Sequence, residues 1–137
     1  MTTGYSGTPL AKKLGIKTQA TVALLNEPVG FRALLDPLPD GVSFRTSMGR
    51  SPDLVVAFFT ERARLERRIA ALAKAIFPAA GLWIAWPKKA AKMATDVDDS
   101  VVREVGLAAG IVDIKVCAID ATWSGLRFAH RRENRPS

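Results

Sequence analysis

The sequence contains little of the chemistry on which disulfides, metal sites and nucleophilic catalysis depend. One cysteine and one histidine, Cys117 and His130, are present among 137 residues. A single cysteine excludes a disulfide framework and a cysteine-based zinc site, and a single histidine excludes a histidine-rich metal site. We therefore predict no metal. Cysteine–histidine catalysis would require two distant residues to converge, and Cys117 is expected to be a small core residue of a strand.

Long hydrophobic runs and targeting signals are also lacking. The longest uncharged stretches, such as residues 75–87, contain proline and glycine and are shorter than the ~20 residues that span a bilayer. The first residues lack the basic-then-apolar pattern of a signal peptide. We expect a cytoplasmic protein that has no membrane partner.

Hydrophobic residues, in contrast, are plentiful. They make up 48% of the chain, which excludes a disordered protein. The length suits one domain of about 100–200 residues, which can bury roughly two-thirds of the surface of its unfolded chain. We expect a single α/β domain over residues 1–130, followed by a basic, frayed tail at residues 131–137.

The positive charge is concentrated in one part of the chain. The net charge is +7, and residues 61–92 carry eight basic and two acidic side chains, whereas residues 93–137 carry six and seven. Arg64, Arg67 and Arg68 form a basic patch on a helix predicted at residues 61–76. Such a patch could bind a protein or the phosphates of a nucleic acid. No known nucleic-acid-binding motif accompanies it, and a solvated helix face is the simpler interpretation.

Short apolar runs alternate with segments of helical periodicity along the chain. The helices are predicted at residues 9–14, 29–35, 61–76 and from Thr95 or Asp98 to residue 110. The strands are predicted at residues 20–25, 42–46, 54–59, 81–86, 111–119 and 126–129.

This alternation indicates right-handed crossovers and a mostly parallel sheet with helices on both faces. No helix separates the last two strands, so they are expected to form an antiparallel hairpin at one edge. The predicted fold class is α/β, a three-layer Rossmann-like sandwich whose mostly parallel sheet has an antiparallel edge strand. The order of elements resembles a trimmed class I methyltransferase sheet, as an analogy of fold only.

Six segments are distinctive when they are taken together: residues 5–16 (YSGTPLAKKLGI), 81–90 (GLWIAWPKKA), 95–96 (TD), 101–110 (VVREVGLAAG), 112–120 (VDIKVCAID) and 123–126 (WSGL). With these segments the chain resembles a bacterial family known as domain of unknown function 3052. The similarity covers residues 5 to about 130, and no catalytic residue can be transferred from it.

The methyltransferase analogy raises the question of a cofactor. A nucleotide cofactor usually needs several glycines after the first strand and an acidic residue after the second. The first turn, residues 25–30, has one glycine and a proline, and the second strand is expected to end near Arg45. We therefore predict no cofactor and disfavour both S-adenosylmethionine and NAD.

The carboxyl edge of the sheet is the expected place for a ligand, because open parallel sheets bind ligands there. Lys88 and Lys89 are predicted at this edge, in a crevice rimmed by Trp86 and Trp123, with Ser124 beside them. Cations next to aromatic faces suit an anionic ligand. Tyr5 and Ser6 belong to a loop that could act as a lid. Alternatively, Trp83 and Trp86 are packing residues that point to opposite faces of the sheet, and the lysines only solubilise a loop.

The sequence thus favours a non-catalytic binding or regulatory module with an anionic small-molecule ligand, because every catalytic template fails. One alternative is a divergent, methyltransferase-like enzyme that uses S-adenosylmethionine. The other is a protein that binds nucleic acid or a protein partner through the basic helix at residues 61–76.

Overall fold

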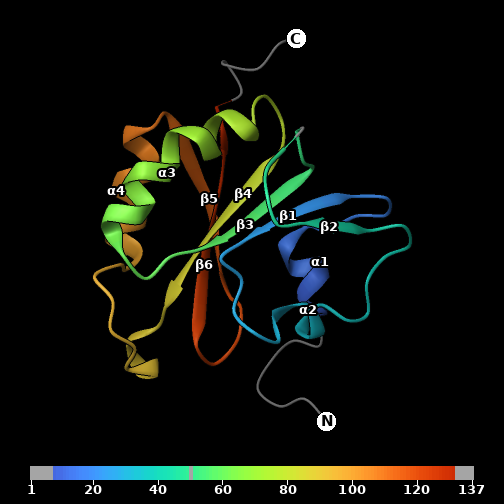
Figure 1. Ribbon diagram of the computed structural model, residues 1–137, viewed down its shortest axis with the longest axis horizontal. Helices are drawn as coiled ribbons and strands as arrows, with labels where there is room; N and C mark the ends of the chain where they lie inside the picture. Colours follow the sequence, from blue (N-terminus) through green and yellow to red (C-terminus); the bar gives the residue numbers. More distant parts are fainter. Residues whose placement is uncertain (1–7, 50, 132–137) are drawn as a thin grey trace.

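The centre of the molecule is one six-stranded sheet, which a computed structural model describes for residues 8–49 and 51–131 (Figure 1). Tyr5, Ser6 and residues 132–137 of the predicted tail lie outside the described residues. The elements are α1 (Leu10–Leu14), β1 (Thr21–Leu25), α2 (Phe31–Leu34), β2 (Ser43–Arg45), β3 (Leu54–Phe58), α3 (Arg62–Ala75), β4 (Gly81–Pro87), the 3-10 helix η1 (Lys89–Ala91), α4 (Asp99–Ala108), β5 (Ile111–Ala118) and β6 (Trp123–His130).

The strands follow the order β2-β1-β3-β4-β6-β5. Neighbouring strands from β2 to β4 are parallel, and β6 is antiparallel to both β4 and β5. The predicted antiparallel strand is therefore present, but it lies between β4 and β5 and not at the edge. The crossover through α4 places β5 two positions away from β4, and β6 then runs back between these two strands.

Strand β6 also begins earlier than the sequence predicts. Trp123 and Ser124, which were expected in the preceding loop, pair with Pro87 and Trp86 of β4. Their place in the strand fixes the side on which each of them lies, because side chains alternate across a sheet.

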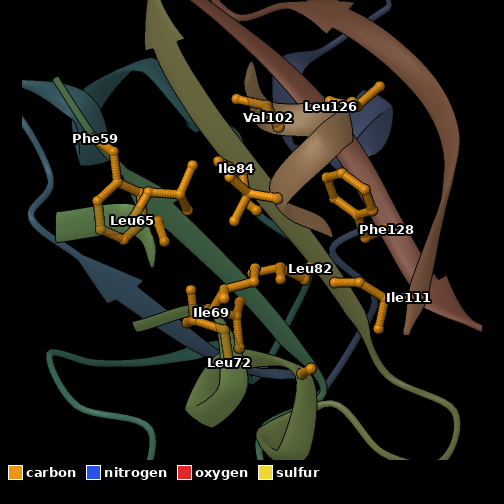
Figure 2. Close-up of a cluster of buried hydrophobic side chains, with 14 of the residues drawn as sticks. Phe59, Leu65, Ile69, Leu72, Leu82, Ile84, Val102, Ile111, Leu126 and Phe128 are labelled. Atoms are coloured by element: carbon orange, nitrogen blue, oxygen red, sulfur yellow. The ribbon is translucent and has the colours of Figure 1, made fainter. Parts of the chain in front are cut away.

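Two hydrophobic cores lie on the two faces of the sheet. Helices α3 and α4 cover one face, and α1 and α2 cover the other (Figure 1). Figure 2 shows the first core, in which Leu65 and Leu72 of α3 lie near Leu82 and Ile84 of β4. The helical spacing of the apolar residues in α3 thus buries one stripe of the helix and leaves its arginines outside the core.

Tryptophans 83 and 86 lie on opposite faces of β4, as the alternative interpretation stated. Trp83 is fully buried in the core under α1, and its indole nitrogen donates to the carbonyl oxygen of Leu14 at 2.8 Å. Trp86 belongs to the core under α3 and α4. Both are packing residues.

The first turn of α3 is closed by a residue from a distant loop. The side chain of Asp96 accepts a hydrogen bond from the backbone N–H of Arg62 at 2.7 Å. Asp98 caps α4 in the ordinary way, by accepting from the N–H of Val101 at 2.9 Å. The loop before α4 therefore joins the amino-terminal ends of both helices that cover this face. Among the described residues, no helix is both long and apolar enough to cross a membrane.

Candidate functional site

The switch point of the sheet lies between β1 and β3. The chain leaves β1 toward β2 on one side, whereas β3 lies on the other side of β1. Ligands of open α/β sheets bind outside the carboxyl ends of the strands at such a point. A cavity of about 360 Å³ is found there. We call it the switch-point cavity, and its lining consists of Leu25, Asn26, Thr46, Phe59, Arg64, Arg67 and Arg68.

The floor of this cavity is fixed by backbone geometry at the end of β1. Asn26 has a φ of 58°, in the left-handed region that asparagine tolerates better than most residues. Its side-chain amide donates to the carbonyl oxygen of Phe58 at 3.1 Å. The N–H of Phe59 bonds in turn to the carbonyl oxygen of Ala85 in β4. The ends of three neighbouring strands are thereby tied together.

Three arginines of α3 form one wall of the switch-point cavity. Arg64, Arg67 and Arg68 are spaced so that they share a face of the helix, and all three side chains line the cavity. Arg64 approaches Glu61 at 3.6 Å, but both side chains are 62% exposed, so this pair contributes little. Among the described residues, no carboxylate forms an ion pair with Arg67 or Arg68. None of the described residues that line the cavity is acidic.

Arg62, on the same helix, is held in a different way. Its guanidinium donates to Glu66 at 2.9 Å and to Glu104 of α4 at 2.7 Å. The hydrogen bond with Glu66, followed by the one with Glu104, raises the pKa of Arg62 above its ordinary value. Arg62 therefore joins α3 to α4, while the other three arginines of α3 line the switch-point cavity.

The residues predicted around Lys88 are only partly brought together. Lys88, Lys89 and Ser124 line a second cavity of about 600 Å³ at the end of β4. The same cavity is lined by Asp96, Asp98 and Asp99. With three carboxylates beside two ammonium groups, this cavity has no preference for an anion. The sequence could not show that the loop before α4 folds back over the lysines.

Trp123 is separated from that cavity by the sheet. It is 8% exposed and belongs to the core on the α1 and α2 face, with its ring edge-on to Phe58 at 5.1 Å. Trp86 lies on the other face. The predicted rim of two tryptophans around Lys88 is therefore not formed. Trp123 pairs with Pro87, the residue after Trp86, so the two tryptophan side chains lie on opposite faces of the sheet.

Cys117 and His130 are core and packing residues. Cys117 lies on the same face as Ile119, as predicted, and burial raises the pKa of its thiol. His130 Nε2 lies 2.6 Å from the carbonyl oxygen of Ala73, and its ring is edge-on to Phe77. In the part of the chain that the structure describes, no group of three or more histidine, cysteine, aspartate or glutamate side chains is arranged so that it could hold a metal ion.

Comparisons with known proteins bear on the fold. No protein-family profile matches the chain, and no curated protein matches its sequence. Among solved structures, an S-adenosylmethionine-dependent methyltransferase from Aquifex aeolicus is similar, with a TM-score of 0.61 and 15% identity over 87% of this chain and 86% of that one. The ribosomal protein L11 methylase of Lactobacillus delbrueckii has a TM-score of 0.58 and 12% identity, with 90% and 75% covered.

The prediction that the chain takes no cofactor is overturned by these comparisons. Magnesium protoporphyrin IX methyltransferase from Synechocystis has been solved with S-adenosylmethionine and also with S-adenosylhomocysteine. Both structures have a TM-score of 0.56 and 10% identity to this chain and cover 89% of it. The share of the other chain that is covered is 74% with S-adenosylmethionine and 78% with S-adenosylhomocysteine. The prediction relied on the small number of glycines in the first turn. This turn nevertheless has left-handed backbone at two positions, Asn26 and Gly30, and the φ of Gly30 is 86°. A Cβ at Gly30 would meet no atom within 4 Å, so the space beside it is open.

These likenesses, at identities of 10–15%, concern the fold and not the activity. They agree with the mixed six-stranded sheet and its inserted antiparallel strand. The chain has an α/β, Rossmann-like fold of the kind found in class I S-adenosylmethionine-dependent methyltransferases.

Proposed function

We propose that this protein is a ligand-binding module of the methyltransferase fold whose ligand is a small anion, carrying phosphate or carboxylate groups, in the switch-point cavity. One observation carries the proposal. Arg64, Arg67 and Arg68 line the place where this fold class binds ligands, and the part of the lining that the structure describes has no acidic residue.

The chemistry of the wall favours an anion. Guanidinium groups bind carboxylates and phosphates through paired, charge-assisted hydrogen bonds. Arg64 and Arg68 are four residues apart on α3, where like charges destabilise a helix by about 0.2–0.5 kcal/mol. A bound anion would remove this repulsion. The volume of about 360 Å³ is within the range of small-molecule sites.

The floor of the cavity suits a neutral, polar part of the same ligand. The amide of Asn26 uses one hydrogen bond on Phe58, which leaves its carbonyl oxygen and a second N–H for a ligand. Thr46 adds a hydroxyl from the end of β2. A ligand with both an anionic and a hydroxyl- or amide-bearing part, as in a nucleotide, matches this arrangement.

S-adenosylmethionine is the second candidate, because solved proteins of this fold bind it and because the turn at Asn26 and Gly30 leaves open space. When bound, it would supply a methyl group for transfer. The turn fits such a cofactor. The wall fits it poorly, since S-adenosylmethionine has a net positive charge, and Arg45 and Thr46 stand where a ribose-binding carboxylate is usual.

Isothermal titration calorimetry separates the candidates. Pyrophosphate, ADP, S-adenosylmethionine and S-adenosylhomocysteine are titrated separately into the wild-type protein. We expect pyrophosphate and ADP to bind, and the double variant Arg67→Gln/Arg68→Gln to bind them at least about tenfold more weakly, since each lost charged hydrogen bond is worth about 1.5–3 kcal/mol.

Lys74→Gln is the matched control, because it removes one positive charge from an exposed position at the other end of α3. We expect it to change the affinity by less than about twofold, the size of a screened long-range effect. Equal losses in the control and the double variant, or no loss in either, would contradict the proposal. Binding of S-adenosylmethionine without binding of the anions would establish the second candidate instead.

Three sequence-based interpretations stay predictions. They are the similarity to domain of unknown function 3052, the cytoplasmic location, and the alternative that α3 binds nucleic acid or a protein. A steep salt dependence of binding to DNA or RNA, which is lost in Arg64→Gln/Arg67→Gln, would favour the nucleic-acid alternative.

A further inference from the structure

A third cavity, of about 450 Å³, lies on the opposite face of the sheet from the switch-point cavity. It is formed by Val29 of the β1–α2 loop, Phe31 at the start of α2, Asp120 of the β5–β6 turn and Trp123 at the start of β6. We call it the loop cavity. We propose that it binds a small molecule that has an apolar body and a cationic nitrogen. This site goes beyond the proposed anion site, because the described linings of the two cavities share no residue and differ in charge preference. Gly30, on which the S-adenosylmethionine alternative partly rests, borders the loop cavity.

The walls of the loop cavity carry apolar side chains that the fold leaves exposed. Val29 is fully exposed, and Leu34 and Met93 are 44% and 41% exposed. These are three of the seven large hydrophobic side chains exposed among the described residues, and all three line this one cavity. Exposed apolar side chains that gather in one place mark a binding surface, whereas isolated ones do not.

The inner end of the loop cavity is formed by buried, packed aromatic side chains. Phe31 and Trp123, which are 1% and 8% exposed, both line it. Each packs edge-on against Phe58, at 4.9 Å and 5.1 Å between ring centroids. Met93, in contrast, is unbranched and adapts to ligands of different shape. A volume of about 450 Å³ is typical of small-molecule sites, and most of the described lining residues are of apolar type.

Asp120 gives the cavity its charge preference. Among the described residues, it is the only ionisable one in the lining. Its Oδ1 accepts hydrogen bonds from the backbone N–H groups of Thr122 and Trp123, both at 2.8 Å, which hold the carboxylate in place. The described residues provide no ion pair to Asp120 and no hydrogen bond to its Oδ2. The carboxylate is therefore oriented and can accept a hydrogen bond from an ammonium group of a ligand.

Phenethylamine and phenylacetate are matched probes, because they share an apolar ring and differ in the sign of the charge. Each is titrated into ¹⁵N-labelled protein and followed in ¹H–¹⁵N spectra. We expect phenethylamine to shift the backbone signals of Val29 and Gly30 and the indole signal of Trp123. Phenylacetate is expected to bind there at least about tenfold more weakly, since a charged hydrogen bond is lost.

Two variants complete the test. Asp120→Asn keeps an oxygen for the two backbone N–H groups and removes the charge, so we expect about tenfold weaker binding of phenethylamine in a folded protein. Leu34→Ser shortens an exposed wall residue and is expected to weaken binding a few-fold, while Leu107→Ser, at an exposed position on α4, leaves it unchanged.

The inference is wrong if both probes bind equally, if the shifts occur elsewhere, or if Asp120→Asn binds phenethylamine as the wild type does. Concentration-dependent shifts of Val29 and Trp123 without any probe would also overturn it, since the patch would then be a self-association surface. A pyrophosphate titration of the same sample reports on the switch-point cavity. Failure at one site can thus be distinguished from failure at the other.

Discussion

The side-chain amide of Asn26 donates to the carbonyl oxygen of Phe58 at 3.1 Å and so joins the carboxyl ends of β1 and β3. These two strands flank the switch point of the sheet. One residue therefore takes the left-handed conformation that the turn requires and also ties together the two strand ends beneath the switch-point cavity. We therefore expect the geometry of the cavity floor to depend on Asn26.

Substitution of Asn26 separates its two roles. Asn26→Gly removes the hydrogen bond but tolerates a φ of 58°, so we expect a loss of about 1 kcal/mol in the free energy of unfolding. Asn26→Ala also introduces left-handed strain and should lose about 2 kcal/mol. Urea unfolding measures both values. A larger loss for glycine than for alanine would show that the turn conformation is not what the residue provides.

Gly106 tests the packing of α4 on the sheet. A Cβ at this position would clash with Cε1 of the Phe128 ring, which is fully buried. Glycine to alanine in a helix normally stabilises by about 1 kcal/mol, but overpacking costs about 1–3 kcal/mol. We expect Gly106→Ala to be destabilising in thermal and urea unfolding, while Leu107→Ala, at an exposed neighbouring position, has a small effect. A stabilised Gly106→Ala would mean that α4 can move away from β6.

Asp96 tests the link between the α4 loop and α3. Asp96→Ala removes the cap on the N–H of Arg62, and loss of such a cap costs about 1 kcal/mol. Asp96→Asn keeps an oxygen acceptor and should lose less. Asp40→Ala removes an exposed carboxylate elsewhere and is the control. Equal free energies of unfolding for Asp96→Ala and the control would exclude the cap.

The raised pKa of Cys117 predicts a loss of stability at alkaline pH. Burial favours the neutral thiol, so the folded state keeps its proton to a higher pH than the unfolded state does. The contribution is fully present below the ordinary thiol pKa of about 8.5 and is lost as the pH rises toward the folded value. We expect the wild type to lose more stability than Cys117→Ala between pH 8 and pH 10. Parallel pH profiles of the two proteins would contradict this cause.

Most helices and strands could be predicted from local pattern. The run at residues 54–59 and the periodicity from Leu65 to Ile76 each reflect burial on one strand or one helix face, and the structure confirms both. The start of β6 could not be predicted, because Trp123 and Ser124 extend the strand only through pairing with β4. The cap on α3 was missed for the same reason, since Asp96 is 34 residues away from Arg62.

The candidate site was only partly predictable. The sequence showed the arginines of α3 and the importance of the carboxyl edge, but the place along that edge depends on strand order, which local pattern does not determine. Once β1 and β3 are neighbours, Arg64, Arg67 and Arg68 line the switch-point cavity, whereas Lys88 and Lys89 lie beside three aspartates. The turn after β1 was misjudged because a left-handed position was equated with glycine, whereas Asn26 occupies it.

The most direct test of the proposed site is a titration of ¹⁵N-labelled protein with pyrophosphate, observed at the arginine side-chain Nε–Hε signals. We predict saturable shifts of Arg67 and Arg68, together with the backbone signals of Asn26 and Thr46, because these residues line the switch-point cavity. Shifts confined to the region of Lys88 and Lys89, or no saturable shift at any of these signals, would contradict an anion site at the switch point.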